Sequence, residues 1–297
     1  MRQSGAVEEG HGRQRHMVGG AARQGVADGA RSRGQTLGHA PLPLVSVLLR
    51  SPIQRIFGVE VERRPAAGPP RWEGTVMGDI SVHGMIGSPF VRSALVALEE
   101  KGQGYRFVPL KLDALRTPEY RALHPFGRVP AFEQDGFVVY ETQAILRHVD
   151  RAFPEPALTP RGLEAAARMD QVLNTIDSYL FADAGAVLGF NRIIAPRILK
   201  VDPDEEACAR AEKRVARALG VLAGVLGDKP HLTGDAMTLA DIALACHLDF
   251  LAATPEGERA IAMVPRLAAF GLRMAERSSF VDTTIPALVR RFLPKKG

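Results

Sequence analysis

The chain has 297 residues, of which 46% are hydrophobic and 24% are charged, and it contains two cysteines. This composition is typical of a globular protein of about two domains, and it excludes a disulfide framework and a cysteine-rich zinc site. The net charge of +5 comes entirely from residues 1–77, which hold 11 Arg, no Lys and 6 acidic residues. The rest of the chain is balanced, which argues against nucleic-acid binding, and no apolar run is long enough to cross a membrane.

Residues 1–77 differ in composition from the rest of the chain. They hold 12 of the 29 glycines, and over most of their length the apolar residues follow neither a helical nor a strand period. Such a segment cannot offset the entropy of ordering, so we expect it to be disordered, or a spurious extension upstream of a true start at Met77. No apolar stretch typical of a secretory signal follows the first residues, and we expect a cytoplasmic protein.

Residues 78–156 show the pattern of an α/β unit. A strand is predicted for Ile80–Gly84, and Ser88-Pro89 marks a helix start, because Ser is a favoured N-cap and Pro a favoured first helical residue. A second strand at Tyr105–Leu110 completes a βαβ unit. The rest of this part is predicted to form a short helix, two strands joined by an Asp-Gly turn, and a longer helix: 118–123, 129–132, 137–140 and 141–153.

After a proline-rich linker, residues 161–297 are predicted to be helical throughout. Apolar residues recur at helical spacing over 163–180 and 204–226, and a last amphipathic segment covers 265–274. Thr238 and Asp241 fit the [ST]-x-x-[DE] pattern of a capping box and predict the start of another helix.

Three motifs occur in the order and at the spacing of one known family. His124-Pro-Phe-Gly-Arg-Val-Pro130 resembles a turn of the cytosolic glutathione transferases, Glu141-Thr-Gln-Ala-Ile-Leu146 resembles their glutathione-binding signature, and Leu232 to Asp241 resembles a capping segment of their helical domain. The resemblance covers residues 79 to about 293. It implies an α/β thioredoxin-like N-terminal domain, then an all-α helical-bundle domain, and a homodimer that takes part in detoxification.

Ser88 indicates the class within this family. The Ser-type enzymes, phi most closely, place a catalytic serine at the start of the first helix, and this sequence has neither the tyrosine nor the cysteine that the other types place there. A hydroxyl that donates a hydrogen bond to sulfur stabilises the thiolate of glutathione, and so do the amides of a helix N-terminus. The alternative is that Ser88 serves only as an N-cap.

The resemblance also implies a set of glutathione ligands. Val129 would pair its backbone with the cysteinyl unit next to a cis Pro130, and Glu141 and Thr142 would hold the γ-glutamyl end at a helix start, which attracts anions. The glycyl carboxylate needs a cation, for which Arg128 and the nearby loop are candidates. Each position also has a structural interpretation, such as an edge-strand proline or a Thr N-cap. The predicted ligands are Arg116, Arg128, Val129, Pro130, Glu141 and Thr142.

The second-substrate pocket is expected between the two domains. Its predicted lining is apolar and consists of Met85, Ile86, Phe90, Met169, Val172 and Leu173. The histidines have no metal-ligand spacing, so we expect no metal. The function predicted is a transferase that adds glutathione thiolate to small apolar electrophiles. Two alternatives remain open: another glutathione-dependent reaction (peroxide reduction, isomerisation or dehalogenation), and a non-catalytic regulatory module of the same fold.

Overall fold

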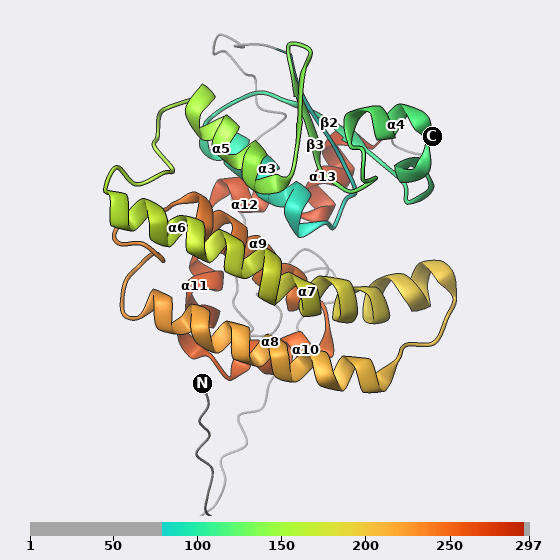
Figure 1. Ribbon diagram of the computed structural model, residues 1–297, viewed down its shortest axis with the longest axis vertical. Helices are drawn as coiled ribbons and strands as arrows, with labels where there is room; N and C mark the ends of the chain where they lie inside the picture. The colour runs from blue at the N-terminus through green and yellow to red at the C-terminus, as the bar shows by residue number, and fades with distance from the viewer. Residues whose placement is uncertain (1–78, 294–297) are drawn as a thin grey trace, which may run out of the picture. The chain divides into compact units, whose positions relative to one another are not determined.

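The computed structural model describes residues 79–293, so the expectations for residues 1–77 lie outside the described residues (Figure 1). The first part of the described chain alternates strands and helices in the predicted order. Its elements are β1 (Ile80–Gly84), α3 (Pro89–Glu100), β2 (Arg106–Pro109), η1 (Asp113–Arg116), α4 (Pro118–Leu123), β3 (Ala131–Gln134), β4 (Phe137–Tyr140) and α5 (Thr142–Ala152).

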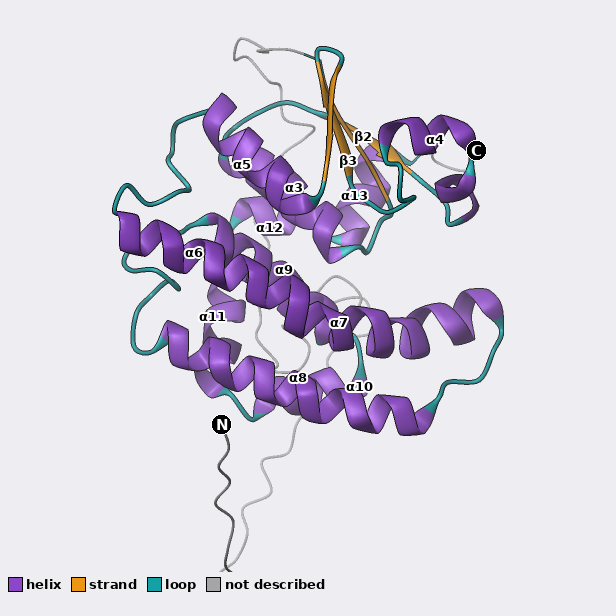
Figure 2. Ribbon diagram, viewed as in Figure 1, coloured by secondary structure: helices purple, strands orange, loops and turns teal. Residues whose placement is uncertain are grey.

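The four strands form one mixed sheet in the order β2-β1-β3-β4. Figure 2 draws the strands of this sheet in orange. Strands β1 and β2 are parallel because α3 connects them, whereas β3 and β4 form an antiparallel hairpin. The hairpin turn is Asp135-Gly136, and both residues have positive φ, as a tight hairpin of this type requires. Helices α3 and α5 pack against each other, α3 also contacting β1 and α5 contacting β4. This arrangement is the predicted thioredoxin-like fold.

The second part of the chain is entirely helical. Its elements are α6 (Leu163–Thr175), η2 (Ile176–Leu180), α7 (Phe181–Asp183), η3 (Ala184–Leu199), α8 (Glu205–Leu226), α9 (Leu239–Leu251), α10 (Pro255–Ala262), α11 (Pro265–Ala275), α12 (Ser278–Asp282) and α13 (Ile285–Phe292). The helix predicted for 163–180 continues to Leu199 through wide π-type turns in η2 and η3. Gly185 lies under the ring of Phe181, where a Cβ atom would clash. Glycine here permits close packing instead of ending the helix.

Helix α9 lies at the centre of the helical part and joins it to the sheet-bearing part. It packs against α3, α6 and α11, and all of its residues except Asp249 and Phe250 are buried. Across the α3–α9 contact, the Arg92 guanidinium donates to Asp249 at 2.6 Å and to the Phe280 carbonyl at 2.9 Å. The start of α3 is therefore anchored to α9 and α12 by a charged side chain that is itself satisfied.

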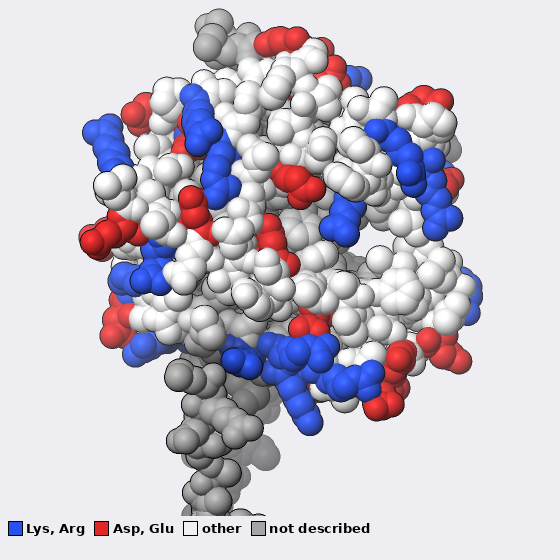
Figure 3. All heavy atoms as spheres, in the orientation of Figure 1, with Lys and Arg blue, Asp and Glu red and all other residues white. Residues whose placement is uncertain are grey.

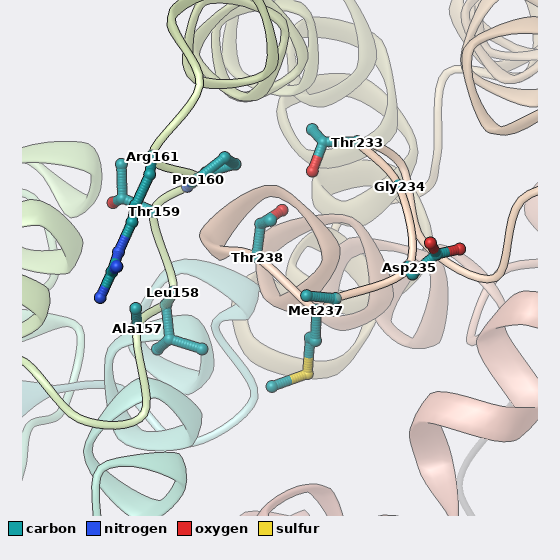
Figure 4. A pocket seen from close by; sticks show the side chains of 11 residues that line it. Ala157, Leu158, Thr159, Pro160, Arg161, Thr233, Gly234, Asp235, Met237 and Thr238 are labelled. Atoms are coloured by element: carbon teal, nitrogen blue, oxygen red, sulfur yellow. The ribbon is translucent and has the colours of Figure 1, made fainter.

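The linker between the two parts runs close to the loop before α9 (Figure 4). The Leu239 amide donates to the Leu158 carbonyl at 3.0 Å, and a small cavity of about 270 Å³ lies between the linker and residues 233–238. At the other end of the linker, the buried Lys101 ammonium donates to Asp150 and to the Pro156 carbonyl, each at 2.6 Å. None of the helices within residues 79–293 combines the length and hydrophobicity of a membrane-spanning helix.

Candidate glutathione site

Three segments that carry predicted site residues meet at one end of the sheet. His83 near the end of β1 pairs with Ala131 at the start of β3, and Ala131 pairs with Tyr140 at the end of β4. The segments attached to these residues therefore leave the sheet at the same end. They are the loop that carries Ser88, the Val129-Pro130 dipeptide and the Glu141-Thr142 pair.

Ser88 caps α3 and remains partly accessible. Its hydroxyl oxygen accepts from the Val91 amide at 3.4 Å, which is long for an N–H···O hydrogen bond. The preceding Gly87 has φ of 95°, a conformation that favours glycine, and it turns the chain from β1 into the helix. The capping role predicted for Ser88 is confirmed. A hydroxyl has one proton and two lone pairs, so accepting from Val91 leaves the proton free for another partner.

Helix α5 begins at Thr142 without a side-chain cap. Glu141, which precedes it, is exposed and has φ of 70°, a left-handed conformation that costs energy in a residue other than glycine. Thr142 is buried, with 8% of its surface exposed. The first-turn amides of α5 therefore have no side-chain acceptor of their own, and the helix dipole favours an anion there.

The loop before β3 has the predicted cis Val129–Pro130 peptide bond. Val129 is half-buried and Pro130 is buried. Tyr120 fixes the loop from α4, because its hydroxyl donates to the Arg128 carbonyl at 2.7 Å. Gly127 has φ of 59°, and a Cβ atom there would lie 2.6 Å from the Leu115 carbonyl oxygen. The glycine of this turn is therefore required by backbone geometry.

The predicted cations lie on the surface. Arg116, at the end of η1, and Arg128, two residues before Pro130, are exposed. Within residues 79–293 neither guanidinium forms an ion pair or a side-chain hydrogen bond. Both belong to segments that follow β2 or precede β3, and Pro109 of β2 pairs with Gly84 of β1. Both therefore lie toward the end of the sheet that carries the other motifs.

His124 is a feature that sequence reasoning could not interpret. It is 2% exposed, its ring lies 4.8 Å from that of Tyr140, and its Nδ1 atom has no hydrogen-bond partner. Burial lowers the pKa of His124, and the nearby Glu141 carboxylate opposes that shift in part. The side chain is a neutral aromatic support behind the loop that carries Arg128.

Asp177 is a neighbour of this site that the sequence did not reveal. It lies on η2 and accepts a hydrogen bond from the Gln143 side chain at 2.5 Å. Burial raises the pKa of Asp177, and the nearby Glu141 carboxylate raises it further. Residues 143 and 177 are far apart in the chain and belong to α5 and η2, so no local sequence pattern could have indicated the contact.

Ser88 lies on the wall of a cavity of about 840 Å³. Met85 and Ile86, two of the predicted pocket residues, also line it. Helix η3 and the C-terminal segment supply most of the other apolar lining, and sequence reasoning assigned no role to them. The lining includes Ile193, Ile194 and Ile198 of η3, Ile285 and Leu288 of α13, Phe181 of α7 and Phe250 of α9. Figure 3 shows the surface hollowed between the sheet-bearing part and the helix below it.

The other four predicted pocket residues do not line this cavity. Met169, Val172 and Leu173 are each 1% exposed and belong to the core, because their face of α6 packs against α9. Phe90 is half-buried and does not line this cavity. Its ring contacts those of Phe181 at 4.4 Å and His247 at 4.8 Å, so it supports the wall from behind.

Comparisons with known proteins agree with this geometry. Residues 82–157 match the family "Glutathione S-transferase, N-terminal domain", and residues 179–278 match "Glutathione S-transferase, C-terminal domain". Glutathione S-transferase 4 of Zea mays is 30% identical over 200 residues, which are 67% of this chain and 88% of that protein. The chain belongs to the glutathione S-transferase family.

Solved structures support the same assignment. The apo form of glutathione S-transferase III has a TM-score of 0.63 and 27% identity, and the match covers 74% of this chain and 99% of that one. Glutathione S-transferase I bound with lactoylglutathione has a TM-score of 0.62 and 26% identity, covering 69% and 98%. Further relatives are F-type plant enzymes, so this glutathione S-transferase is phi-like.

Proposed function

We propose that this glutathione S-transferase binds glutathione at the end of the sheet described above and adds its thiolate to an electrophile in the neighbouring cavity. The observation that carries the proposal is the strand register His83–Ala131–Tyr140, which brings Ser88, Val129-Pro130 and Glu141-Thr142 to one place. Ser88 also lines the cavity of about 840 Å³, whose apolar wall is supplied largely by η3 and the C-terminal segment.

Ser88 is the group we propose to activate the sulfur. A free thiol titrates near pKa ~8.5, and lowering this value by about two units requires a preference for the thiolate of roughly 2.7 kcal/mol. A charge-assisted hydrogen bond contributes about 1.5–3 kcal/mol, and a helix N-terminus adds up to about 1 kcal/mol. The Ser88 hydroxyl would donate a hydrogen bond to sulfur while its oxygen accepts one from the Val91 amide, so the capping and catalytic roles are compatible.

Each part of glutathione then has a partner of matching chemistry. The uncapped start of α5 suits the γ-glutamyl carboxylate, with Thr142 in the first turn and Glu141 facing the ammonium group. The Val129 backbone would pair with the cysteinyl unit as an added strand does. Arg128 or Arg116 would receive the glycyl carboxylate, since neither guanidinium has an acidic partner within residues 79–293.

We also propose a homodimer. Large apolar side chains are exposed on β4, on the turn before β3 and along α6 and η2, where burial against a second copy would remove them from water. They are Phe126, Phe137, Leu163 and Tyr179, with exposed fractions of 69%, 55%, 90% and 68%. Sedimentation of the wild type and of Phe126→Glu tests this proposal. The charged variant should shift toward the monomer, and an unchanged state would contradict it.

We further propose that the protein acts in the cytoplasm, where it would detoxify electrophiles. Both cysteines, Cys208 and Cys246, are free and buried, which is compatible with a reducing compartment. The experiment for the activity itself is conjugation of glutathione to a neutral aryl chloride, together with retention of the protein on immobilised glutathione. Turnover with retention supports a transferase. Retention without turnover on any electrophile would indicate a binding module instead.

A further inference from the structure

The charges that line the cavity are not equivalent. Four charged side chains contribute to its wall, and two of them, Arg92 and Asp249, form a pair at 2.6 Å. The Arg92 guanidinium also donates a hydrogen bond to the Phe280 carbonyl. Arg197, by contrast, is exposed, and within residues 79–293 its guanidinium has no hydrogen bond or ion pair. Among the described residues, Arg197 is therefore the cationic group of the cavity wall whose donors have no partner.

The position of Arg197 connects that charge to the apolar wall. It lies near the end of η3, next to Ile198 and three and four residues after Ile194 and Ile193, all of which line the cavity. Because all of these residues line one cavity, the stem of Arg197 continues the apolar surface while its exposed guanidinium stays in water. Ser88, at the start of α3, lines the same cavity. An elongated ligand can therefore extend from the serine to the arginine.

We propose that the preferred second substrate is an electrophile with an apolar body and a carboxylate, and that Arg197 binds the carboxylate. The guanidinium presents a planar fork of donors that matches a carboxylate in a bidentate manner, which a neutral or cationic substrate cannot use. This inference rests on the proposed transferase activity and adds a substrate class to it. Arg197 acts as a specificity-determining residue for the second substrate.

Glu258 is the fourth charged residue of the wall, and it makes the orientation selective. It is exposed on α10, and no ion pair joins it to Arg197. An acidic group placed near Glu258 would be repelled, and one placed at Arg197 would be attracted. Of the two ways in which an acidic arene can enter the cavity, the pair of charges favours the one that puts its acid at Arg197.

The test compares 4-chloro-3-nitrobenzoate with its neutral methyl ester as partners of glutathione. In both reactions the thiolate sulfur attacks the carbon that carries chlorine, the C–S bond forms, chloride leaves with the C–Cl electron pair, and the thiol proton has passed to water. Each enzymatic rate is divided by the uncatalysed rate, which removes the different reactivities of the two arenes. The measured quantity is the ratio of kcat/KM for the acid to kcat/KM for the ester.

Arg197→Gln should lower this ratio by about 3- to 10-fold, because a charge-assisted hydrogen bond at an exposed or partly exposed site contributes an effect of that size. The matched control is Arg217→Gln, which removes an exposed arginine on α8 outside the cavity, and it should leave the ratio unchanged. Glu258→Gln should not lower the ratio. An equal ratio in wild type and Arg197→Gln, or a wild-type preference for the ester that Glu258→Gln removes, would overturn the inference.

Direct binding separates this inference from the proposed activity. Equilibrium dialysis with the unreactive acid 3-nitrobenzoate requires no turnover. In one outcome, wild type turns over neither arene but binds this acid, and Arg197→Gln weakens the binding whereas Arg217→Gln does not. The anion site is then supported and the transferase proposal fails. If wild type turns over both arenes and shows no Arg197-dependent binding of the acid, the transferase proposal stands and the anion site is rejected.

Discussion

Helices α3 and α9 both begin with a polar side chain that accepts hydrogen bonds, but the two caps have different roles. At α9 the Asp241 carboxylate is fully buried and accepts from the amides of Leu232 and Thr238 at 2.8 Å and from the Thr238 hydroxyl at 2.7 Å. At α3 the Ser88 hydroxyl is half-buried, accepts one long hydrogen bond from Val91, and faces a cavity. A cap whose hydrogen bonds are all used inside the protein can only stabilise, whereas one with an unused proton beside a cavity can act on a ligand.

The largest expected effect is a loss of stability when the buried cap of α9 is removed. Asp241→Ala should lower the free energy of unfolding by about 3–5 kcal/mol, because each buried N–H left without an acceptor costs about 1–3 kcal/mol. Asp235→Ala, in the exposed part of the same loop, is the control and should change it by less than about 0.5 kcal/mol. Urea unfolding measures both. If the Ala variant does not fold, Asp241→Asn gives a graded value, and equal stability of Asp241→Asn and Asp235→Ala would contradict the role of the carboxylate.

At α3 the expected effect is on rate. Ser88→Ala should lower conjugation at neutral pH by about 10- to 1000-fold, or roughly 1.4–4 kcal/mol, with glutathione binding nearly unchanged. The apparent pKa of bound glutathione should rise toward its free value, because the hydroxyl favours thiolate over thiol. The ultraviolet band of the thiolate, followed against pH, measures this without a second substrate, and the exposed Ser278→Ala is the control. The same apparent pKa in wild type and Ser88→Ala would leave Ser88 as a cap alone.

The start of α5 extends the comparison to a helix with no side-chain cap at all. Thr142→Ala and Glu141→Ala should each weaken glutathione binding by about 1–3 kcal/mol if a charged group of the ligand loses its partner. Calorimetric titration with glutathione measures the affinity, and Glu164→Ala, in the exposed first turn of α6, is the control. Unchanged affinity in both variants would mean that α5 does not hold the γ-glutamyl end.

A titratable group lies where α3 meets α9. His247 of α9 is buried, its ring is 4.8 Å from that of Phe90 of α3, and burial lowers its pKa to about 4. In the unfolded chain this histidine takes up a proton near pKa ~6.5, and in the folded protein it does so only near 4. Its contribution to stability is therefore complete above about 6.5 and is lost as the pH falls toward 4. By pH 5.5 the loss from this group is about 1.4 kcal/mol.

His247→Leu should reduce the loss of stability between pH 7.5 and pH 5.5 by that amount, whatever its effect at pH 7.5. Urea unfolding of wild type and variant at both pH values gives the difference of differences. The same fall in stability for both proteins would show that His247 does not titrate in this range when the chain is unfolded, or that the folded protein accepts the proton.

Structural features that depend on residues close together in the sequence were predictable. Ser88-Pro89 and the pair Thr238 and Asp241 indicated helix starts because caps and their partners lie within three residues of each other. The order of strands and helices followed from apolar periodicity and turn residues in the same way. A thioredoxin-like part followed by a helical part was therefore within reach of the sequence.

The parts that depend on tertiary packing were not predictable. Periodicity showed that Met169 and Leu173 face inward, but not that they face α9 and the core instead of the cavity. Helix η3 lies beyond the predicted end of its helix at residue 180, so Arg197 had no assigned element. Its place on the cavity wall depends on contacts between elements that are far apart in the chain.

The smallest expected effect is the stability lost with the Ser88 cap. N-cap substitutions to Ala cost about 0.5–2 kcal/mol, and the 3.4 Å separation from Val91 places this cap at the low end, near 0.5 kcal/mol. Thr238→Ala is the matched comparison, and it should cost more because its buried partner Asp241 loses a donor. Urea unfolding with and without glutathione completes the test. A ligand stabilises the folded state by RT ln(1 + [L]/Kd), so equal affinity predicts that glutathione stabilises wild type and Ser88→Ala by the same increment. A loss at Ser88 as large as that at Thr238 would show that its hydroxyl serves mainly the helix, and the distinction between an open and a closed cap would fail.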